Sequence, residues 1–185
     1  MSTPVTARPD AAPPVRPSPL VERVFGEPRF HADGDVAALA FGADGRLLSI
    51  DEGGVLKHWA SDGKLLARHF LSDLETLWCF GPGAKVLASG NDDLLLWDTA
   101  TGQLLSRIEQ ADGAAWLTAL AFAADGATVA SGHDDGTVRI WDARAFKLVG
   151  AFAAHPRQPV SAVAFSPDGR FVATAGEDLS VRVWD

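Results

Sequence analysis

One stretch of about 43 residues recurs along this 185-residue chain and constrains its fold more than any other feature. Residues 165–185 read FSPDGRFVATAGEDLSVRVWD, and residues 122–142 read FAADGATVASGHDDGTVRIWD, which match almost position for position. Shorter copies occupy residues 80–98 and 41–59. The copies share a closing tryptophan, and these lie 38, 44 and 43 residues apart, at Trp59, Trp97, Trp141 and Trp184. Such a period is typical of arrays in which each copy is one supersecondary unit.

Each copy has the pattern of strands joined by tight turns. The third copy runs WLTALAF, TVASG, TVRIWD and KLVGAFA, separated by AADG, HDDG and ARAF. Asp-Gly pairs are typical of hairpins because glycine accepts the positive φ that a tight turn requires. They occur at Asp44-Gly45, Asp125-Gly126 and Asp168-Gly169. We therefore predict that each copy is a four-stranded antiparallel meander.

The predicted strands are apolar on both faces, as in Ala38 to Phe41 and Leu94 to Trp97. Neither face of such a sheet can be left in water, because burial of apolar surface is the main force that stabilises the fold. In a tandem array the neighbouring copy covers each face. The sequence thus predicts an all-β fold of four small antiparallel sheets packed face to face.

The strand endings VRIWD (138–142), VRVWD (181–185) and LLLWD (94–98), together with the FSPDG turn, resemble the WD-repeat β-propeller family. The resemblance covers residues 20–185 and is strongest in the third and fourth copies. It implies a WD-repeat β-propeller of four visible four-stranded blades, with repeats at about 31–70, 71–109, 110–153 and 154–185, the last one truncated. Residues 1–19 are rich in proline and are expected to form a disordered tail.

The resemblance also implies a buried hydrogen-bonded tetrad in each blade. Its members are a His before the first strand, a Ser or Thr on the second strand, the Asp of the next turn and the Trp of the third strand. A sheet packed on both faces cannot leave such polar groups unpaired, so the network stabilises the blade. Carried over by position, the members are His155, Thr174, Asp178 and Trp184 in the fourth copy, Ser131, Asp135 and Trp141 in the third, His31, Ser49 and Trp59 in the first, and Ser89 and Trp97 in the second.

Three copies depart from the full tetrad. The third has no His in its preceding loop, which reads QADGAAW, and the first has Gly53 where the Asp is expected. The short turn of the second copy leaves the role of Asp93 open.

Thr174, His155 and Asp178 resemble the nucleophile, base and orienting acid of a catalytic triad. An active site is normally built once, whereas this set recurs with Ser in place of Thr, which favours a structural role. The run His133, Asp134 and Asp135 is interpreted as a solvated turn, because adjacent side chains on a tight turn diverge too widely to bind a metal together. We therefore expect no catalysis, no metal and no cofactor.

Charge and composition argue against several partners. With 16 basic and 24 acidic residues the net charge is -8, whereas a nucleic-acid-binding protein needs a basic footprint. The first twenty residues lack the apolar core of a signal peptide, and no apolar run of about 18 residues suits a membrane span. Cys79 lies among apolar neighbours and is interpreted as a buried, inert thiol. We expect a cytoplasmic protein with no nucleic-acid or membrane partner.

The fourth copy has no fourth strand after Asp185, while residues 20–25 (LVERVF) resemble an outer strand with no blade in front of it. The family resemblance implies that such a strand completes the last blade of a ring. Three arrangements stay open: a four-bladed ring closed by residues 20–25, a ring shared with a second copy, and a longer protein whose C-terminal remainder completes the ring. The third arrangement is favoured.

A propeller of this kind implies a non-catalytic scaffold that presents protein or peptide partners on one face. The residue before each turn Asp, or its equivalent, is acidic, at Glu52, Asp92, Asp134 and Glu177. If they share a face they attract a basic partner; the alternative is that turns are simply rich in acids. Trp116, just before a first strand, is either an exposed anchor or buried. An alternative function is a regulatory or sensor propeller fused to a catalytic or signalling domain that this sequence does not contain.

Overall fold

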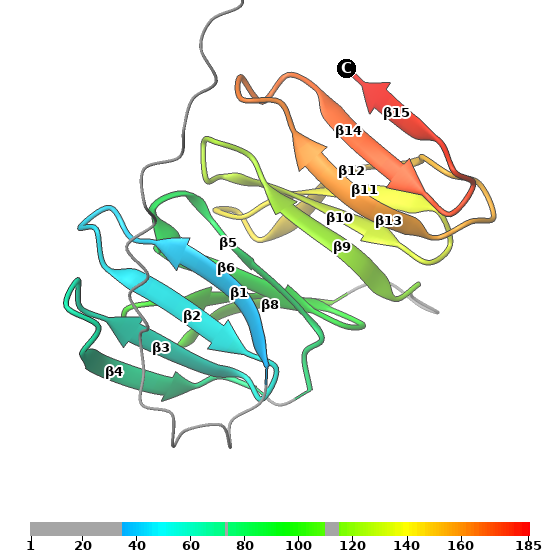
Figure 1. Ribbon diagram of the computed structural model, residues 1–185. Coiled ribbons are helices and arrows are strands. Elements are labelled where there is room, and N and C mark those ends of the chain that lie inside the picture. Colours follow the sequence, from blue (N-terminus) through cyan, green and yellow to red (C-terminus); the bar gives the residue numbers. More distant parts are fainter. Residues whose placement is uncertain (1–34, 73, 110–114) are drawn as a thin grey trace, which may run out of the picture.

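The computed structural model describes residues 35–72, 74–109 and 115–185. Within these ranges the chain forms fifteen β-strands and a single 3-10 turn, Pro82–Ala84. The strands make four antiparallel sheets, each in simple meander order (Figure 1). The predicted all-β class is confirmed.

The first two sheets have four strands each. The first contains β1 (Val36–Phe41), β2 (Leu47–Asp51), β3 (Val55–Trp59) and β4 (Leu65–Phe70). The second contains β5 (Leu77–Phe80), β6 (Val86–Gly90), β7 (Leu94–Asp98) and β8 (Leu104–Ile108).

The third sheet has four strands and the fourth has three. The third contains β9 (Leu117–Phe122), β10 (Thr128–His133), β11 (Thr137–Asp142) and β12 (Lys147–Ala153). The fourth contains β13 (Val160–Phe165), β14 (Val172–Gly176) and β15 (Val181–Trp184), so its outer position is empty among the described residues. The predicted strand 20–25, the predicted tail 1–19 and His31 lie outside the described residues.

The hairpin turns are formed as predicted from the Asp-Gly pairs. The glycines have φ values of 77°, 65° and 71° at Gly45, Gly126 and Gly169. In three sheets a register shift interrupts the pairing of the first and second strands at the same end, between Val36 and Ala38, between Gly132 and His133, and between Val160 and Ala162. Such bulges redirect side chains at the end of a strand.

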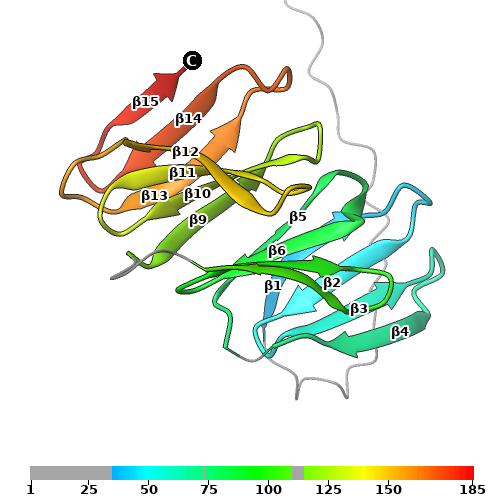
Figure 2. The ribbon, with the colours of Figure 1, turned by 180° about the vertical axis from the view of Figure 1, so that it is seen from behind.

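The four sheets are arranged as blades of a propeller whose ring is not closed (Figures 1 and 2). The first strand of each blade lies on the inner side, where β1 contacts β5, β5 contacts β9 and β9 contacts β13. The fourth strands β4, β8 and β12 lie at the opposite edge of their sheets. We refer to the sheets as blades 1 to 4 in chain order.

Apolar clusters fill the space between neighbouring blades. Trp97 of blade 2 packs with Leu48, Ile50 and Leu56 of blade 1. The tryptophans of blades 3 and 4 pack in the same way on the blade before them, Trp141 with Leu94, Leu96 and Ile108, and Trp184 with Ala130, Val138 and Phe152. The prediction that each sheet is covered by its neighbours is confirmed for these three interfaces.

Cys79 on β5 is half-buried, so its thiol is less enclosed than the expected buried thiol. Burial still raises the pKa of its thiol, which keeps the reactive thiolate form scarce.

Candidate functional site

A hydrogen bond between an indole and a hydroxyl recurs in all four blades. In each one the Trp at the end of the third strand donates its Nε1–H to a Ser or Thr on the second strand. The nitrogen-to-oxygen distances are 2.9 Å for Trp59 and Ser49, 2.8 Å for Trp97 and Ser89, 2.7 Å for Trp141 and Ser131, and 3.0 Å for Trp184 and Thr174.

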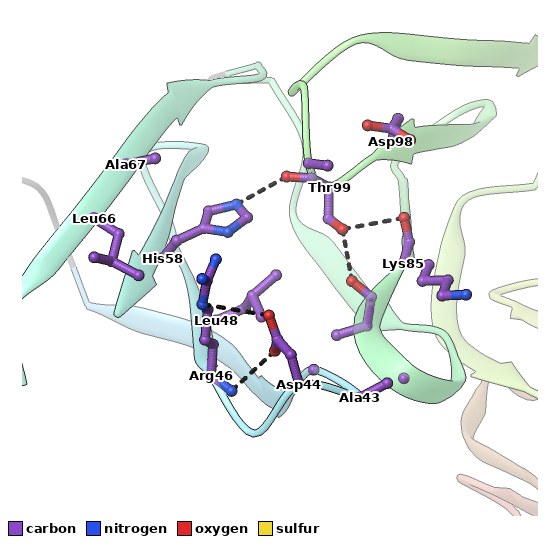
Figure 3. A pocket seen from close by; sticks show the side chains of 14 residues that line it. Ala43, Asp44, Arg46, Leu48, His58, Leu66, Ala67, Lys85, Asp98 and Thr99 are labelled. Atoms are coloured by element: carbon purple, nitrogen blue, oxygen red, sulfur yellow. Dashed lines mark hydrogen bonds and ion pairs between the residues drawn. The ribbon is translucent and has the colours of Figure 1, made fainter. Parts of the chain in front are cut away.

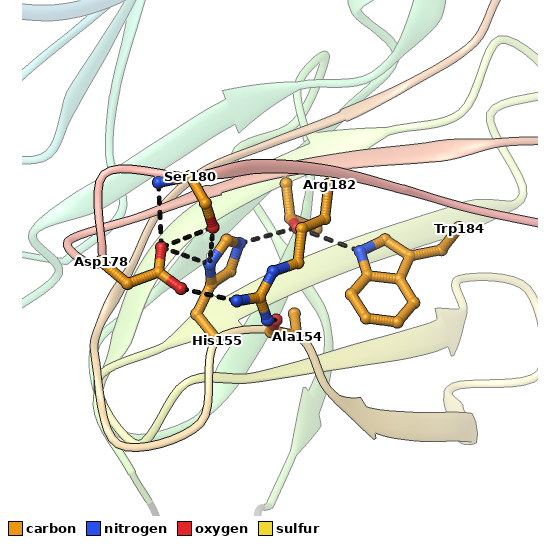
Figure 4. A network of polar contacts seen from close by, with 7 residues as sticks. Ala154, His155, Asp178, Ser180, Arg182 and Trp184 are labelled. Carbon is orange, nitrogen blue, oxygen red and sulfur yellow. Dashed lines mark hydrogen bonds and ion pairs between the residues drawn. The ribbon is translucent and has the colours of Figure 1, made fainter.

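Blade 4 extends this pair into a larger network (Figure 4). The fully buried His155 places Nε2 2.9 Å from Thr174 Oγ1 and Nδ1 2.9 Å from Asp178 Oδ1. Because Thr174 already accepts from Trp184, its own hydrogen is free to point at His155 Nε2. We assign the neutral imidazole with hydrogen on Nδ1, since that tautomer satisfies every group in the chain from Trp184 to Asp178.

Asp178 is held by several donors. The Ser180 hydroxyl lies 2.7 Å from Oδ1 and the Ser180 backbone nitrogen 3.1 Å from it, while Arg182 Nη2 lies 2.8 Å from Oδ2. The hydrogen bond from the Ser180 hydroxyl, together with that from His155, lowers the pKa of Asp178 to about 2. Arg182 also donates to the Ala154 carbonyl and so ties the third strand to the loop that carries His155.

Blade 3 builds a similar network from a different segment of the chain. His133, the last residue of β10, is fully buried, and its Nε2 lies 2.8 Å from Ser131 Oγ. Its Nδ1 lies 3.1 Å from the Ala115 carbonyl, which can only accept, so Nδ1 carries the hydrogen. Burial lowers the pKa of His133 to about 4.

The interpretation of residues 133–135 as a solvated turn was therefore wrong for His133. Asp134 and Asp135 are exposed, and Asp135 bonds to the backbone nitrogen and hydroxyl of Thr137, at 2.8 and 2.6 Å. The register shift between Gly132 and His133 allows His133 to be buried while Asp134 and Asp135 are exposed.

His133 and His155 bind the equivalent hydroxyl in their respective blades, although they come from different segments of the repeat. Aligning the copies places His133 of blade 3 opposite Gly176 of blade 4. A Cβ atom built on Gly176 would lie 2.4 Å from the ring of His155, so the loop histidine fills the space beside Gly176. The third copy thus has a histidine at the end of its second strand and none in the loop, whereas the fourth has a loop histidine and a glycine at the end of its second strand. An alignment of the repeats could have revealed this exchange.

Blade 1 fills the equivalent position with a carboxylate. Asp51 aligns with His133 and is buried. Its Oδ1 accepts from the Val55 backbone nitrogen at 2.9 Å, and its Oδ2 accepts from Lys57 Nζ at 3.0 Å. Asp51 was not predicted from the sequence, because the position expected for the Asp of the tetrad is occupied by Gly53.

In blade 2 the aligned residue is Asn91. Its side-chain oxygen is buried and has no hydrogen-bond partner among the described residues, while its backbone carbonyl accepts from Leu117 of blade 3 at 2.9 Å. Asp93, whose role the sequence left open, bonds to Arg107 on the outer strand, 2.6 Å from Nε.

The four acidic residues singled out in the sequence, Glu52, Asp92, Asp134 and Glu177, are all exposed. Three of them make the same backbone hydrogen bond to the residue that enters the first strand of their blade. The nitrogen of Glu52 donates to Asp35 at 2.8 Å, that of Asp134 to Trp116 at 3.0 Å and that of Glu177 to Pro159 at 3.0 Å. Trp116 is 57% exposed.

A cleft of about 670 Å³ lies between blades 1 and 2, at the end of the blades that carries the turn between β1 and β2 (Figure 3). His58 Nε2 lies 2.8 Å from the Thr99 carbonyl, and burial lowers the pKa of His58. The Thr99 hydroxyl donates to the Ala84 carbonyl at 2.6 Å. The His58 contact joins the two blades, whereas the bond from Thr99 to Ala84 lies within blade 2.

The described residues contain no group of three or more His, Cys, Asp or Glu side chains able to hold a metal ion. In the same part of the chain no helix has the length and apolar character needed to cross a membrane.

Comparisons with known proteins agree with this architecture. Residues 102–142 and 146–185 match the family described as WD domain, G-beta repeat. The chain is 33% identical over 111 residues, 58% of its length, to U3 small nucleolar RNA-associated protein 12 of Saccharomyces cerevisiae. It is 28% identical over 122 residues, 62% of its length, to small ribosomal subunit protein RACK1y of Oryza sativa subsp. japonica.

These matches span only 12% and 36% of the two relatives. A solved structure, the computationally designed Ika4 protein, superposes with a TM-score of 0.65 at 30% identity, over 82% of this chain and 91% of that one. The Trp-Asp repeats, the meander blades, the recurring indole–hydroxyl pairs and these similarities lead to one assignment: the chain belongs to the WD-repeat family of β-propeller proteins.

Proposed function

We propose that the protein is a non-catalytic interaction scaffold that binds a Lys- or Arg-rich peptide of a protein partner on the face carrying Glu52, Asp92, Asp134 and Glu177. We call this set the acidic rim. The supporting observation is the backbone hydrogen bond that Glu52, Asp134 and Glu177 share. Because equivalent backbone bonds hold these residues in equivalent turns, we infer that the three side chains lie at the same end of the propeller.

Charge is the reason for a basic partner. The rim carboxylates are exposed, in a protein with a net charge of -8. Like charges gathered on one surface raise the local concentration of oppositely charged segments and speed their association. This attraction acts over the Debye length, about 8 Å at physiological ionic strength, so it weakens in salt.

Trp116 is the proposed source of affinity. Its carbonyl accepts from the rim residue Asp134 while its side chain stays 57% exposed, so the indole lies beside the rim. Exposed tryptophans are frequent anchors of protein interfaces because they bury a large apolar area on binding. Its ring can also stack on the guanidinium or ammonium group of a bound peptide.

A scaffold role agrees with how the polar groups of the repeats are used. His133, His155 and Thr174 are buried and engaged in hydrogen bonds with neighbours in their own blades. Groups so enclosed stabilise the blades and offer a substrate no access. We place this activity in the cytoplasm as part of the proposal.

The experiment measures binding of a fluorescent peptide of alternating Arg and Gly to the full chain at several salt concentrations. The double variant Asp134→Lys/Glu177→Lys should slow association about tenfold and flatten its salt dependence. The melting temperature should not change, because both side chains are exposed.

A matched control reverses Asp62 and Asp185, exposed acids near the opposite ends of the strands, which gives the same change in net charge. It should leave most of the binding rate intact. Equal slowing by both double variants, or unaltered binding by the rim variant, would show that the rim does not select the peptide. Trp116→Ala should weaken affinity while preserving the salt dependence.

A further inference from the structure

Every interface between neighbouring blades is built from two different halves. The later blade contributes the face that bears its tryptophan, and the earlier blade contributes aliphatic residues of its second and third strands. Between blades 3 and 4, for example, Trp184 packs against a surface formed by Ala130, Val138 and Ile140. Blade 1 has no blade before it and blade 4 has none after it among the described residues, so one half of each kind has no partner there.

Blade 1 exposes its tryptophan-bearing half. Val36, Leu39 and Phe41 on β1 are 61%, 61% and 71% exposed. The aligned residues in blades 3 and 4 are more enclosed. Val36 aligns with Leu117 and Val160, which are 5% and 0% exposed, and the counterparts of Leu39 and Phe41 there are half-buried.

Blade 4 exposes its aliphatic half. Val181 and Val183 on β15 are 75% and 66% exposed. Val181 aligns with Leu56 and Val138, both fully buried against the blade that follows them. Together with Ala173, the pair repeats the Ala130, Val138 and Ile140 surface on which Trp184 packs.

We propose that a second copy of this chain binds head to tail, with the Trp59-bearing face of its blade 1 on the Val181 and Val183 face of blade 4. The second copy is the occupant that supplies the matching half, because each open face repeats one side of an interface that this chain already forms three times. The two open faces differ from each other, so contact between identical faces does not reproduce that interface.

Head-to-tail contacts form rings when their rotation closes and filaments when it does not. Two chains that bind each other through both faces, each contributing the four blades of its described residues, would form a closed ring of eight blades with no open apolar face. This closure also removes the exposed patches that make an open arc prone to aggregation.

The test measures the mass of the full chain in solution by light scattering after size exclusion. The chain mass is 19.5 kDa, and we expect a particle of twice that mass. Phe41→Lys and Val183→Lys each alter an exposed side chain on one open face, and each alone should weaken self-association at least tenfold. Val149→Lys, at a position 64% exposed on the outer strand β12, is the matched control and should remain dimeric.

Mixing the two variants separates head-to-tail binding from every other contact. The intact blade 4 face of Phe41→Lys and the intact blade 1 face of Val183→Lys should combine into a one-to-one complex. Leu39→Glu and Val181→Glu form a second pair if either Lys variant fails to fold, as judged by circular dichroism. A monomeric wild type, a dimer that survives Val183→Lys, or a mixture that stays monomeric would each overturn the proposal.

Discussion

Replacing Ser131 by Ala tests whether the network of blade 3 stabilises the fold. The hydroxyl accepts from Trp141 Nε1 at 2.7 Å and lies 2.8 Å from His133 Nε2. Ser131 and His133 are fully buried and Trp141 is 2% exposed, so water cannot replace the lost oxygen. The substitution leaves an indole N–H and an imidazole nitrogen without partners.

The cost follows from these two groups. Each buried polar group left unpaired costs about 1 to 3 kcal/mol. Local relaxation recovers part of that sum, so we expect Ser131→Ala to lower the free energy of unfolding by about 2 to 4 kcal/mol. The same chemical change at Ser161, which is exposed on β13, should cost less than about 0.5 kcal/mol.

Urea titration followed by tryptophan fluorescence and circular dichroism measures both variants against the wild type. The comparison uses the midpoint and the slope together, because repeat proteins can lose cooperativity and then no single free energy applies. Equal midpoints for Ser131→Ala and Ser161→Ala would refute the assignment of a stabilising network in blade 3.

Two further predictions concern the same histidine position. Burial lowers the pKa of His133 from 6.5 to about 4, so between these pH values the unfolded chain binds a proton that the folded chain does not. The free energy of unfolding should therefore fall by about 2 to 3 kcal/mol as the pH drops from 6.5 to 4. Melting curves of His133→Gln should lack this part of the pH dependence, and an equal pH dependence of the variant and the wild type would contradict the reasoning. Gly176→Ala should destabilise blade 4 by more than about 2 kcal/mol in urea titration, because the new methyl group meets His155 at 2.4 Å, whereas Gly150→Ala, with no atom within 4 Å, should be nearly neutral.

The architecture could be predicted from the sequence because its signals are local and repeated. The Asp-Gly pairs fixed the hairpins, and the spacing of Trp59, Trp97, Trp141 and Trp184 fixed the blades. Apolar residues on both faces of each strand required neighbours on both sides, and the three clusters between blades supply them for both faces of blades 2 and 3 and for one face each of blades 1 and 4.

The polar interiors of the blades were harder to predict, because different chain segments can fill the space beside the Ser or Thr hydroxyl that recurs in the blades. His155 reaches that volume from a loop and His133 from the end of a strand. In blade 1 the aligned residue, Asp51, is buried and bonds to Lys57. A prediction that assigns each role to a fixed sequence position therefore identifies His155 and misses His133 and Asp51.

The exchange between Gly176 and His133 has a consequence for how this array can evolve. Duplication and recombination of repeats would exchange whole or partial blades. In blade 4, however, the loop that carries His155 and the strand end that carries Gly176 must be inherited together, because the histidine ring occupies the space beside the glycine. A hybrid with the loop of blade 4 and the hairpin of blade 3 would bring two imidazoles into one space. The reciprocal hybrid would leave a void beside Ser or Thr. Viable crossovers should therefore fall between complete loop-and-hairpin units.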